Sequence, residues 1–161
     1  VADCMNLPFD DNSFDCVIAN HVIFYCEEPG KAFKEIKRVL KPRGKAVFST
    51  YGSHHMQEIA QLVNQFDKRI VLSADVLYEK FGLDNGERLL KKYFNKVDKR
   101  LYDDYLLVDV AEPIIEYILS CHGNQNHYLL DRYSGFKAFI MKKTRKPLKI
   151  TKEAGVFVFF N

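Results

Sequence analysis

The sequence lacks several features that mark whole classes of protein. None of its apolar runs approaches the roughly 18 consecutive residues that a membrane-crossing helix needs, and no basic segment followed by an apolar stretch opens it. The four cysteines form no CxxC pair, and the apolar neighbours of Cys16 and Cys26 favour buried, reduced thiols over a disulfide frame. We therefore expect a cytoplasmic protein with no membrane partner.

An excess of charge of one sign is also missing. The chain has 24 basic and 21 acidic residues, and this net charge of +3 is too small to indicate a polyanionic partner. The basic run KKTRKP, residues 142–147, favours a solvated helix end over a nucleic-acid patch. From this charge pattern we predict no nucleic-acid partner. His54 and Glu58 are one helical turn apart but have no HExxH pattern and no fixed third ligand, so we also predict no metal site.

The first half of the chain has the pattern of a strand, a helix and a second strand. Residues 14–20, FDCVIAN, are short, apolar and rich in β-branched side chains, as in a strand covered on both faces of a parallel sheet. Pro29 suits a first helical position, and Pro42 and Gly44 are expected to end that helix. One apolar stripe at helical spacing follows Pro29 and consists of Ala32, Phe33, Ile36, Val39 and Leu40. Residues 45–51 form a second strand, so a parallel βαβ unit is predicted.

Beyond Gly52 the pattern becomes helical. Helices are predicted over residues 53–70, 74–81 and 84–94, and Asp84 and Glu87 have capping-box spacing at the start of the third. A strand over 97–102 precedes a helix in residues 106–120, where Asp109 and Glu112 repeat that spacing, and a further helix covers 127–143. Residues 152–155 indicate a turn between two strands, of which the last is VFVFF.

One segment carries a specific resemblance. Residues 2–50 contain, in order, an acidic residue before LPF, the acidic turn DDNSFD, a strand ending in asparagine and histidine, and a helix ending RVLKP before another strand. This ordered set resembles the middle of the class I S-adenosylmethionine (SAM)-dependent methyltransferase domain, in its ubiquinone/menaquinone-biosynthesis-like, or type 11, group. A nicotinamide-dependent doubly wound enzyme shares the sheet but explains neither LPFDDNSFD nor RVLKPRG.

The resemblance implies part of a SAM site. Asp3 matches the carboxylate that accepts a hydrogen bond from the adenine amino group, and the amide of Cys4 would meet a ring nitrogen beside it. Asn20 and His21 lie at the carboxyl end of a predicted strand, where ligands of open α/β sheets bind, and match positions along the methionine part of the cofactor. Two plainer interpretations stay open: Asp3 as a solvated turn residue, and His21 packed beneath its loop.

The family's glycine-rich turn and its ribose-binding acidic residue are absent from the sequence. We therefore expect a chain that lacks the first strands of the fold, with about half of a SAM site and weak or no activity of its own. The expected acceptor of the intact protein is a small molecule, and His21, Tyr51, His54 and His55 are candidate general bases. The later aromatic residues favour core packing over an acceptor pocket; they are Tyr78, Phe81, Tyr93, Phe94 and Tyr105.

The predicted fold class is therefore α/β: a three-layer, Rossmann-like methyltransferase fold with a mostly parallel sheet, an antiparallel closing strand and a helical insertion. Residues 1–161 are expected to form a single partial domain, with the SAM-site half in 1–51, the insertion in 52–95, and C-terminal strands and helices in 96–161. The alternative is a non-catalytic α/β module that self-associates, as a homodimer for example, through an unpaired apolar strand edge.

Overall fold

The computed structural model describes residues 1–73 and 75–161, and the side chain of residue 103 also lies outside the description. The chain divides into two compact units. The first contains residues 1–53, 77–103 and 153–161, and the second contains residues 54–76 and 104–152. Strands β3 (Val97–Val108) and β4 (Leu148–Phe160) each pass from one unit into the other. The division into a single domain with an insertion over 52–95 stays a prediction.

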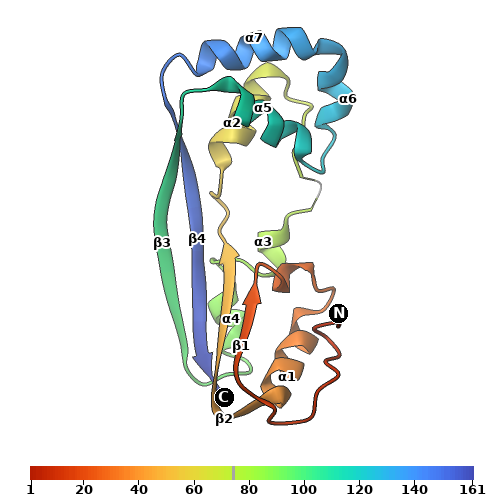
Figure 1. Ribbon diagram of the computed structural model, residues 1–161, viewed down its shortest axis with the longest axis vertical. Coiled ribbons are helices and arrows are strands. Elements are labelled where there is room, and N and C mark those ends of the chain that lie inside the picture. Colours follow the sequence, from red (N-terminus) through yellow and green to blue (C-terminus); the bar gives the residue numbers. More distant parts are fainter. Residues whose placement is uncertain (74) are drawn as a thin grey trace. The chain divides into compact units, whose positions relative to one another are not determined.

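The first unit contains the predicted βαβ arrangement. Strand β1 (Phe14–Asn20) pairs in parallel with β2 (Leu40–Tyr51), and helix α1 (Pro29–Val39) connects them (Figure 1). Pro29 lies in the first turn of α1, where a missing N–H costs no helical hydrogen bond. The buried stripe of α1 is the predicted one and consists of Ala32, Phe33, Ile36 and Val39, followed by Leu40 at the helix end. The parallel βαβ unit is therefore confirmed.

Helix α1 ends earlier than predicted. Leu40 already has extended backbone angles and begins β2, so the expectation that Pro42 and Gly44 end the helix was wrong. The side-chain amide of Asn161 donates hydrogen bonds to the carbonyls of Lys37 and Leu40, at 3.2 and 3.0 Å. These bonds satisfy carbonyl groups that the helix leaves without partners at its end, which no local sequence signal could indicate.

The closing strand is antiparallel, as predicted. β4 pairs with β2 from Lys45 opposite Phe160 to Tyr51 opposite Ala154, and the described sheet has the order β1-β2-β4-β3. The turn expected at residues 152–155 is absent, because β4 continues through it. Gly155 pairs with Thr50, and a Cβ atom at Gly155 would lie 2.6 Å from the carbonyl oxygen of Arg100. The glycine therefore permits close approach of two strands of the sheet instead of forming a turn.

Two short helices complete the first unit. They are α3 (Leu77–Lys80) and α4 (Gly86–Leu90), and a 3₁₀ turn, η1 (Ile23–Tyr25), follows β1. The helix predicted over 74–81 starts at residue 74, which lies outside the described residues. Asn85, not Asp84, is the cap residue of α4, and its side chain makes no cap hydrogen bond, so the Asp84–Glu87 capping box was wrong. The core of this unit is rich in phenylalanine: Phe33, Phe48, Phe81, Phe94, Phe157 and Phe159 are buried in it.

The second unit is helical. It contains α2 (Gln57–Phe66), α5 (Ala111–Ser120), α6 (Gln125–Leu129), the 3₁₀ turn η2 (Leu130–Arg132) and α7 (Tyr133–Lys143). Its buried core includes Ile115, Ile118, Phe136 and Ile140. The helix predicted over 127–143 is thus three pieces, and β3 continues to Val108, six residues past its predicted end.

The start of α5 also differs from the prediction. Val110 is its cap residue and no side chain caps the helix, so the Asp109–Glu112 capping box was wrong. Glu112 instead forms an ion pair with Lys137 of α7, at 3.1 Å. The contact with a second helix, which sequence spacing does not show, determines the partner of this carboxylate.

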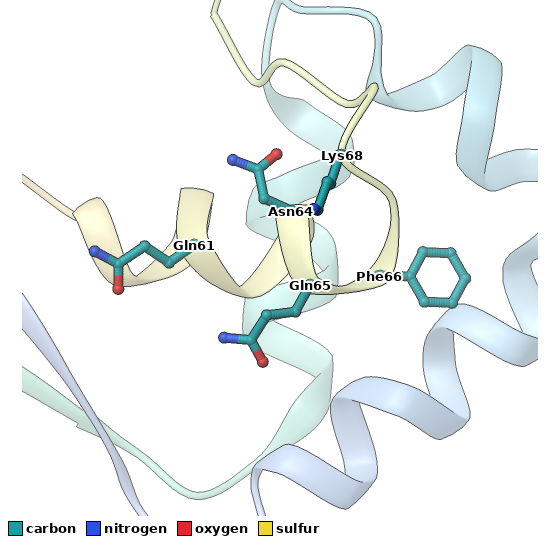
Figure 2. A pocket seen from close by; sticks show the side chains of 5 residues that line it. All are labelled: Gln61, Asn64, Gln65, Phe66 and Lys68. Carbon is teal, nitrogen blue, oxygen red and sulfur yellow. The ribbon is translucent and has the colours of Figure 1, made fainter.

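A surface depression of about 870 Å³ runs along α2 (Figure 2). Its lining consists of Gln61, Asn64, Gln65, Phe66 and Lys68, none of which is a predicted site residue. The ring of Phe66 packs on Phe136 and Phe139 of α7, with centroids 5.2 and 5.4 Å apart.

Among the described residues, no helix combines the length and the apolar character that spanning a membrane demands.

Candidate functional site

The candidate site of the first unit begins where β1 and β2 end. Asn20 and Ser49 are opposite each other in the parallel pair. The main-chain N–H of His21 donates to the Ser49 hydroxyl oxygen at 3.0 Å, and that hydroxyl donates to the side-chain carbonyl of Asn20. Because carboxyl ends of parallel strands lie at one sheet edge, these polar groups are where an open α/β sheet binds ligands. The geometry fixes the orientation of the Asn20 side chain.

His21 has an unusual backbone at this edge. Its φ is 51°, in the left-handed region that side chains other than glycine rarely adopt. Its exposed ring stacks on Tyr51 with centroids 6.3 Å apart and an interplanar angle of 16°, and Phe24 lies 6.0 Å from it. Tyr51 also contacts Tyr78 of α3, at 6.3 Å. Two candidate bases, His21 and Tyr51, are therefore adjacent within one aromatic group.

The predicted adenine-binding turn lies beside the loop that follows β1. One carboxylate oxygen of Asp3 accepts the N–H of Met5 at 2.8 Å, which holds the turn, and Asp3 is exposed. The thiols of Cys4 and Cys26 are in contact, with 3.0 Å between their sulfur atoms. Cys26 immediately follows η1, so this contact brings the turn at Asp3 close to the segment that starts at Asn20.

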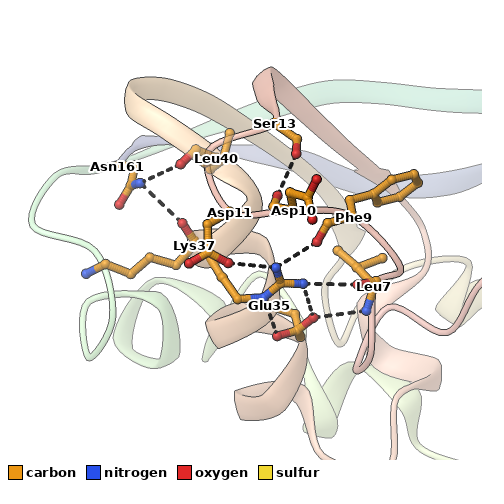
Figure 3. A network of polar contacts seen from close by, with 10 residues as sticks. Leu7, Phe9, Asp10, Asp11, Ser13, Glu35, Lys37, Leu40 and Asn161 are labelled. Carbon is orange, nitrogen blue, oxygen red and sulfur yellow. Dashed lines mark hydrogen bonds and ion pairs between the residues drawn. The ribbon is translucent and has the colours of Figure 1, made fainter.

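The segment between this turn and β1 is fixed by two charged residues of α1 (Figure 3). The guanidinium of Arg38 donates to both carboxylate oxygens of Glu35, to a carboxylate oxygen of Asp11, and to the carbonyls of Leu7 and Phe9. Glu35 in turn accepts the N–H of Leu7 at 3.0 Å. The LPFDD segment therefore has its main chain bonded directly to α1.

Two pKa values follow from these contacts. The hydrogen bonds from Arg38 and from the Leu7 N–H lower the pKa of Glu35 from 4.5 to about 2. Burial, together with the neighbouring Cys4 thiol, raises the pKa of Cys26 from 9.0 to about 12. Glu35 is thus held as a carboxylate, and Cys26 as a neutral thiol.

Five of the predicted residues belong to the first unit: Asp3, Cys4, Asn20, His21 and Tyr51. His54 and His55 belong to the second unit, so the candidate site consists of residues of the first unit alone. Glu58, which was weighed as a metal ligand, accepts hydrogen bonds from the N–H and hydroxyl of Thr151 at 2.9 and 2.6 Å. Of the aromatic residues weighed as pocket lining, Phe81 and Phe94 are buried in the core, whereas Tyr105 is 49% exposed.

One cysteine expectation was wrong. Cys26 is buried, as predicted, but Cys16, on β1, is exposed. Sequence reasoning also missed Ser49, Glu35 and Arg38. Arg38 stands in the RVLKP motif, but its partners in the LPFDD segment are 27 to 31 residues away in the sequence, and only the fold brings them to it.

A mixed α/β sheet with polar groups at the carboxyl ends of its parallel strands defines a class of nucleotide- and cofactor-binding folds. Within that class, residues 1–48 match the model of the methyltransferase domain family. A solved structure of a SAM-dependent methyltransferase from Thermotoga maritima superposes with a TM-score of 0.50 at 14% identity, over 99% of this chain and 61% of that one. This likeness confirms the methyltransferase fold.

Part of the chain is also similar to curated proteins that are named as methyltransferases. A malonyl-[acyl-carrier protein] O-methyltransferase from Methylovorus sp. (strain MP688) is 34% identical over 94 residues, 58% of this chain and 30% of the relative. The ubiquinone/menaquinone biosynthesis C-methyltransferase UbiE of Haemophilus ducreyi is 34% identical over 70 residues, 44% of this chain and 27% of the relative. The chain thus spans under a third of the length of these relatives, and its first 48 residues match the model of the methyltransferase domain family.

Proposed function

We propose that the protein to which this chain belongs transfers a methyl group from SAM to a small-molecule acceptor. The observation that supports this most is the contact between Cys4 and Cys26. It brings the Asp3–Cys4 turn beside the loop after β1, where Asn20, Ser49 and His21 form their hydrogen-bonded group. The turn predicted to contact adenine and the residues predicted to contact the methionine part are therefore neighbours within one unit.

The residues present fit the adenosine part of SAM. Adenine presents an N–H donor next to a ring acceptor, and the exposed Asp3 carboxylate followed by the Cys4 amide offers the complementary pair. Among the described residues, no group accepts a hydrogen bond from the Cys4 N–H. Asn20 and the main chain at His21 would contact the methionine part.

When bound, SAM supplies an activated methyl group on a sulfonium. The protein's contribution to an in-line displacement is to align the acceptor and to exclude water. A general base is needed only for a protonated acceptor, and His21 and Tyr51 are the candidates of the first unit, with His55 a candidate of the second. The sequence has neither the glycine-rich turn nor the ribose-binding acid, so we infer that this chain alone binds SAM weakly and has little activity.

A small molecule is the acceptor class that we favour. The names of the two relatives refer to an acyl-carrier-bound malonyl group and to ubiquinone and menaquinone biosynthesis. The net charge of +3 gives no support to a nucleic-acid acceptor.

A cytoplasmic location remains a prediction from the sequence, and imaging of the tagged protein would test it.

Isothermal titration calorimetry with SAM on the full-length protein tests the proposal. Replacing Asp3 with alanine removes a hydrogen bond to a charged group, worth about 1.5–3 kcal/mol, and should weaken SAM binding about tenfold or more. Asp15→Asn is the matched control, because Asp15 is an exposed carboxylate on β1 that pairs with Lys41 on the surface. Its affinity for SAM should equal that of the unchanged protein.

Two outcomes would contradict the proposal. Full-length protein that is folded by circular dichroism but gives no heat with SAM or S-adenosylhomocysteine is not a SAM-dependent enzyme. Equal SAM affinity in the Asp3→Ala and unchanged proteins would remove Asp3 from the cofactor site.

Self-association is a second candidate function, favoured by the outer edge of β1. Ile18 on this strand is 71% exposed, and an apolar edge strand recruits further strands. If this edge forms a homodimer, sedimentation equilibrium of the chain should show a concentration-dependent dimer that Ile18→Lys converts to monomer, while Lys41→Glu does not. A monomer at all concentrations would exclude this function.

A further inference from the structure

The contact between Cys4 and Cys26 has a chemistry of its own. Two thiols lie with their sulfur atoms 3.0 Å apart, 22 residues apart in the sequence, and a disulfide bond is about 2.05 Å long. We propose that these cysteines form an oxidisable dithiol site that closes into a disulfide with hydrogen peroxide as oxidant, and that closure weakens binding of the adenosine part of SAM. The second part rests on the proposed function, whereas the first does not.

The two cysteines differ in access. Cys4 is half-buried on the turn that contains the exposed Asp3, whereas Cys26 is only 4% exposed and lies in the core of the first unit. A peroxide from solvent therefore meets Cys4 first. Burial raises the pKa of Cys26, which keeps this thiol protonated and a poor target for the oxidant. The contact then supplies Cys26 to the oxidised Cys4 without diffusion.

The reaction balances in two steps. The Cys4 thiolate attacks one peroxide oxygen, the O–O bond breaks, and Cys4 sulfenic acid and hydroxide form. The Cys26 sulfur then attacks the Cys4 sulfur, an S–S bond forms, and the sulfenic hydroxyl leaves as water with the thiol proton. In sum, two thiols lose two electrons and two protons, and the peroxide is reduced to two waters. A thiol reductant reverses the change.

Closure acts on the predicted adenine contact. Forming the bond draws the sulfur atoms about 1 Å closer and requires a dihedral near 90° about the S–S bond, so the turn at Cys4 must shift. A hydrogen bond from the Cys4 N–H lengthened by a comparable distance is lost, because such bonds require about 2.7–3.2 Å. The hydrogen bonds that hold this turn, from the Met5 N–H to the Asp3 carboxylate and from the Asn6 N–H to the Asp3 carbonyl, shift with it.

Mass spectrometry tests the site itself. A Cys16→Ser, Cys121→Ser background leaves Cys4 and Cys26 as the only cysteines of this chain and removes the exposed Cys16. Under dilute hydrogen peroxide the chain should lose the mass of two hydrogens and yield a linked peptide joining Cys4 to Cys26. Adding Cys26→Ser should instead give a Cys4 sulfenic acid that dimedone traps. An unlinked, overoxidised Cys4 in the background variant would overturn the proposal.

Calorimetry tests the consequence in the full-length protein with its other cysteines intact. Oxidised protein should bind SAM at least fivefold more weakly than reduced protein, and dithiothreitol should restore the affinity, whereas a Cys4→Ala variant should show no such change. Equal affinity of the two forms would overturn the regulatory part. If neither form binds SAM, both the proposed function and the regulatory part are contradicted. The dithiol site is then still tested by the linked peptide alone.

Discussion

At the scale of single residues, the site depends on backbone positions that the sequence indicates only in part. Asp3, Cys4, Asn20 and His21 were found from the ordered motif, and their roles toward a cofactor stay predictions. The motif does not indicate the left-handed backbone of His21, because nothing in the chemistry of histidine requires that conformation. Positive φ at a non-glycine residue is a strain that functional sites retain when the surroundings impose it.

We expect the strain at His21 to be measurable. His21→Gly should unfold at a higher temperature than His21→Ala, by a free-energy difference of about 1 kcal/mol, because glycine adopts a φ of 51° without a Cβ penalty. Thermal unfolding followed by circular dichroism measures this difference. Both variants remove the ring that stacks on Tyr51, so they should lose methyl transfer to the same extent if the ring is the general base.

That comparison has a clear contrary result. If His21→Ala is as stable as His21→Gly, the backbone at this position carries no strain. Full activity in both variants would exclude the His21 ring as the base and leave Tyr51 as the candidate of the first unit, with Tyr51→Phe as its test.

At the scale of elements, α1 does more than connect two strands. Its buried stripe was predicted from periodicity, and its polar face contains Glu35 and Arg38, which bond the main chain at Leu7 and Phe9 (Figure 3). The helix therefore positions the segment that joins the Asp3 turn to β1. Helical spacing predicts which residues face the core but not which distant carbonyls a long guanidinium reaches.

Acid should loosen this attachment. The folded-state pKa of Glu35 is about 2, below its ordinary 4.5, so its stabilising effect is present above pH 4.5 and is lost as the pH falls toward 2. Glu35→Gln should lower the free energy of unfolding by about 2 kcal/mol at pH 7, and this deficit should shrink as the pH falls through that window. Urea titrations between pH 2 and pH 7 measure it.

Glu87→Gln is the matched control for this helix-borne carboxylate. Glu87 pairs with Lys91 on the surface, with side chains 40% and 56% exposed, and should contribute little at any pH. A deficit for Glu35→Gln that stays constant from pH 7 to pH 2 would show that the Glu35 charge does not support the fold.

At the scale of the whole molecule, the chain has two separate cores. The first is rich in phenylalanine around β2 and β4, and the second is mostly isoleucine and leucine among helices. Local patterns predicted helices in the second unit but could not show which core each would join. Residues 77–95, for example, were predicted as part of a helical insertion and belong to the same unit as β1 and β2.

Core truncations should act on one unit more than on the other. Phe48→Ala and Phe136→Ala each remove a fully buried ring, a change that costs about 3–5 kcal/mol. Hydrogen exchange followed by mass spectrometry should show the larger loss of protection in residues 29–51 for Phe48→Ala and in residues 111–143 for Phe136→Ala. Equal loss in both segments for both variants would show that the two units unfold as one.

The sequence by itself determined the resemblance of residues 2–50 to the methyltransferase domain, the parallel βαβ unit with the buried stripe of α1, and the antiparallel closing strand, whereas the cofactor residues stay a prediction. These features depend on local patterns and on one ordered motif. The tertiary structure alone decided the partners of Arg38, the contact of Cys4 with Cys26, the unbroken course of β4 through Gly155 and the failure of both capping boxes. The first three depend mainly on groups distant in the sequence, because side chains take the partners that packing brings within reach.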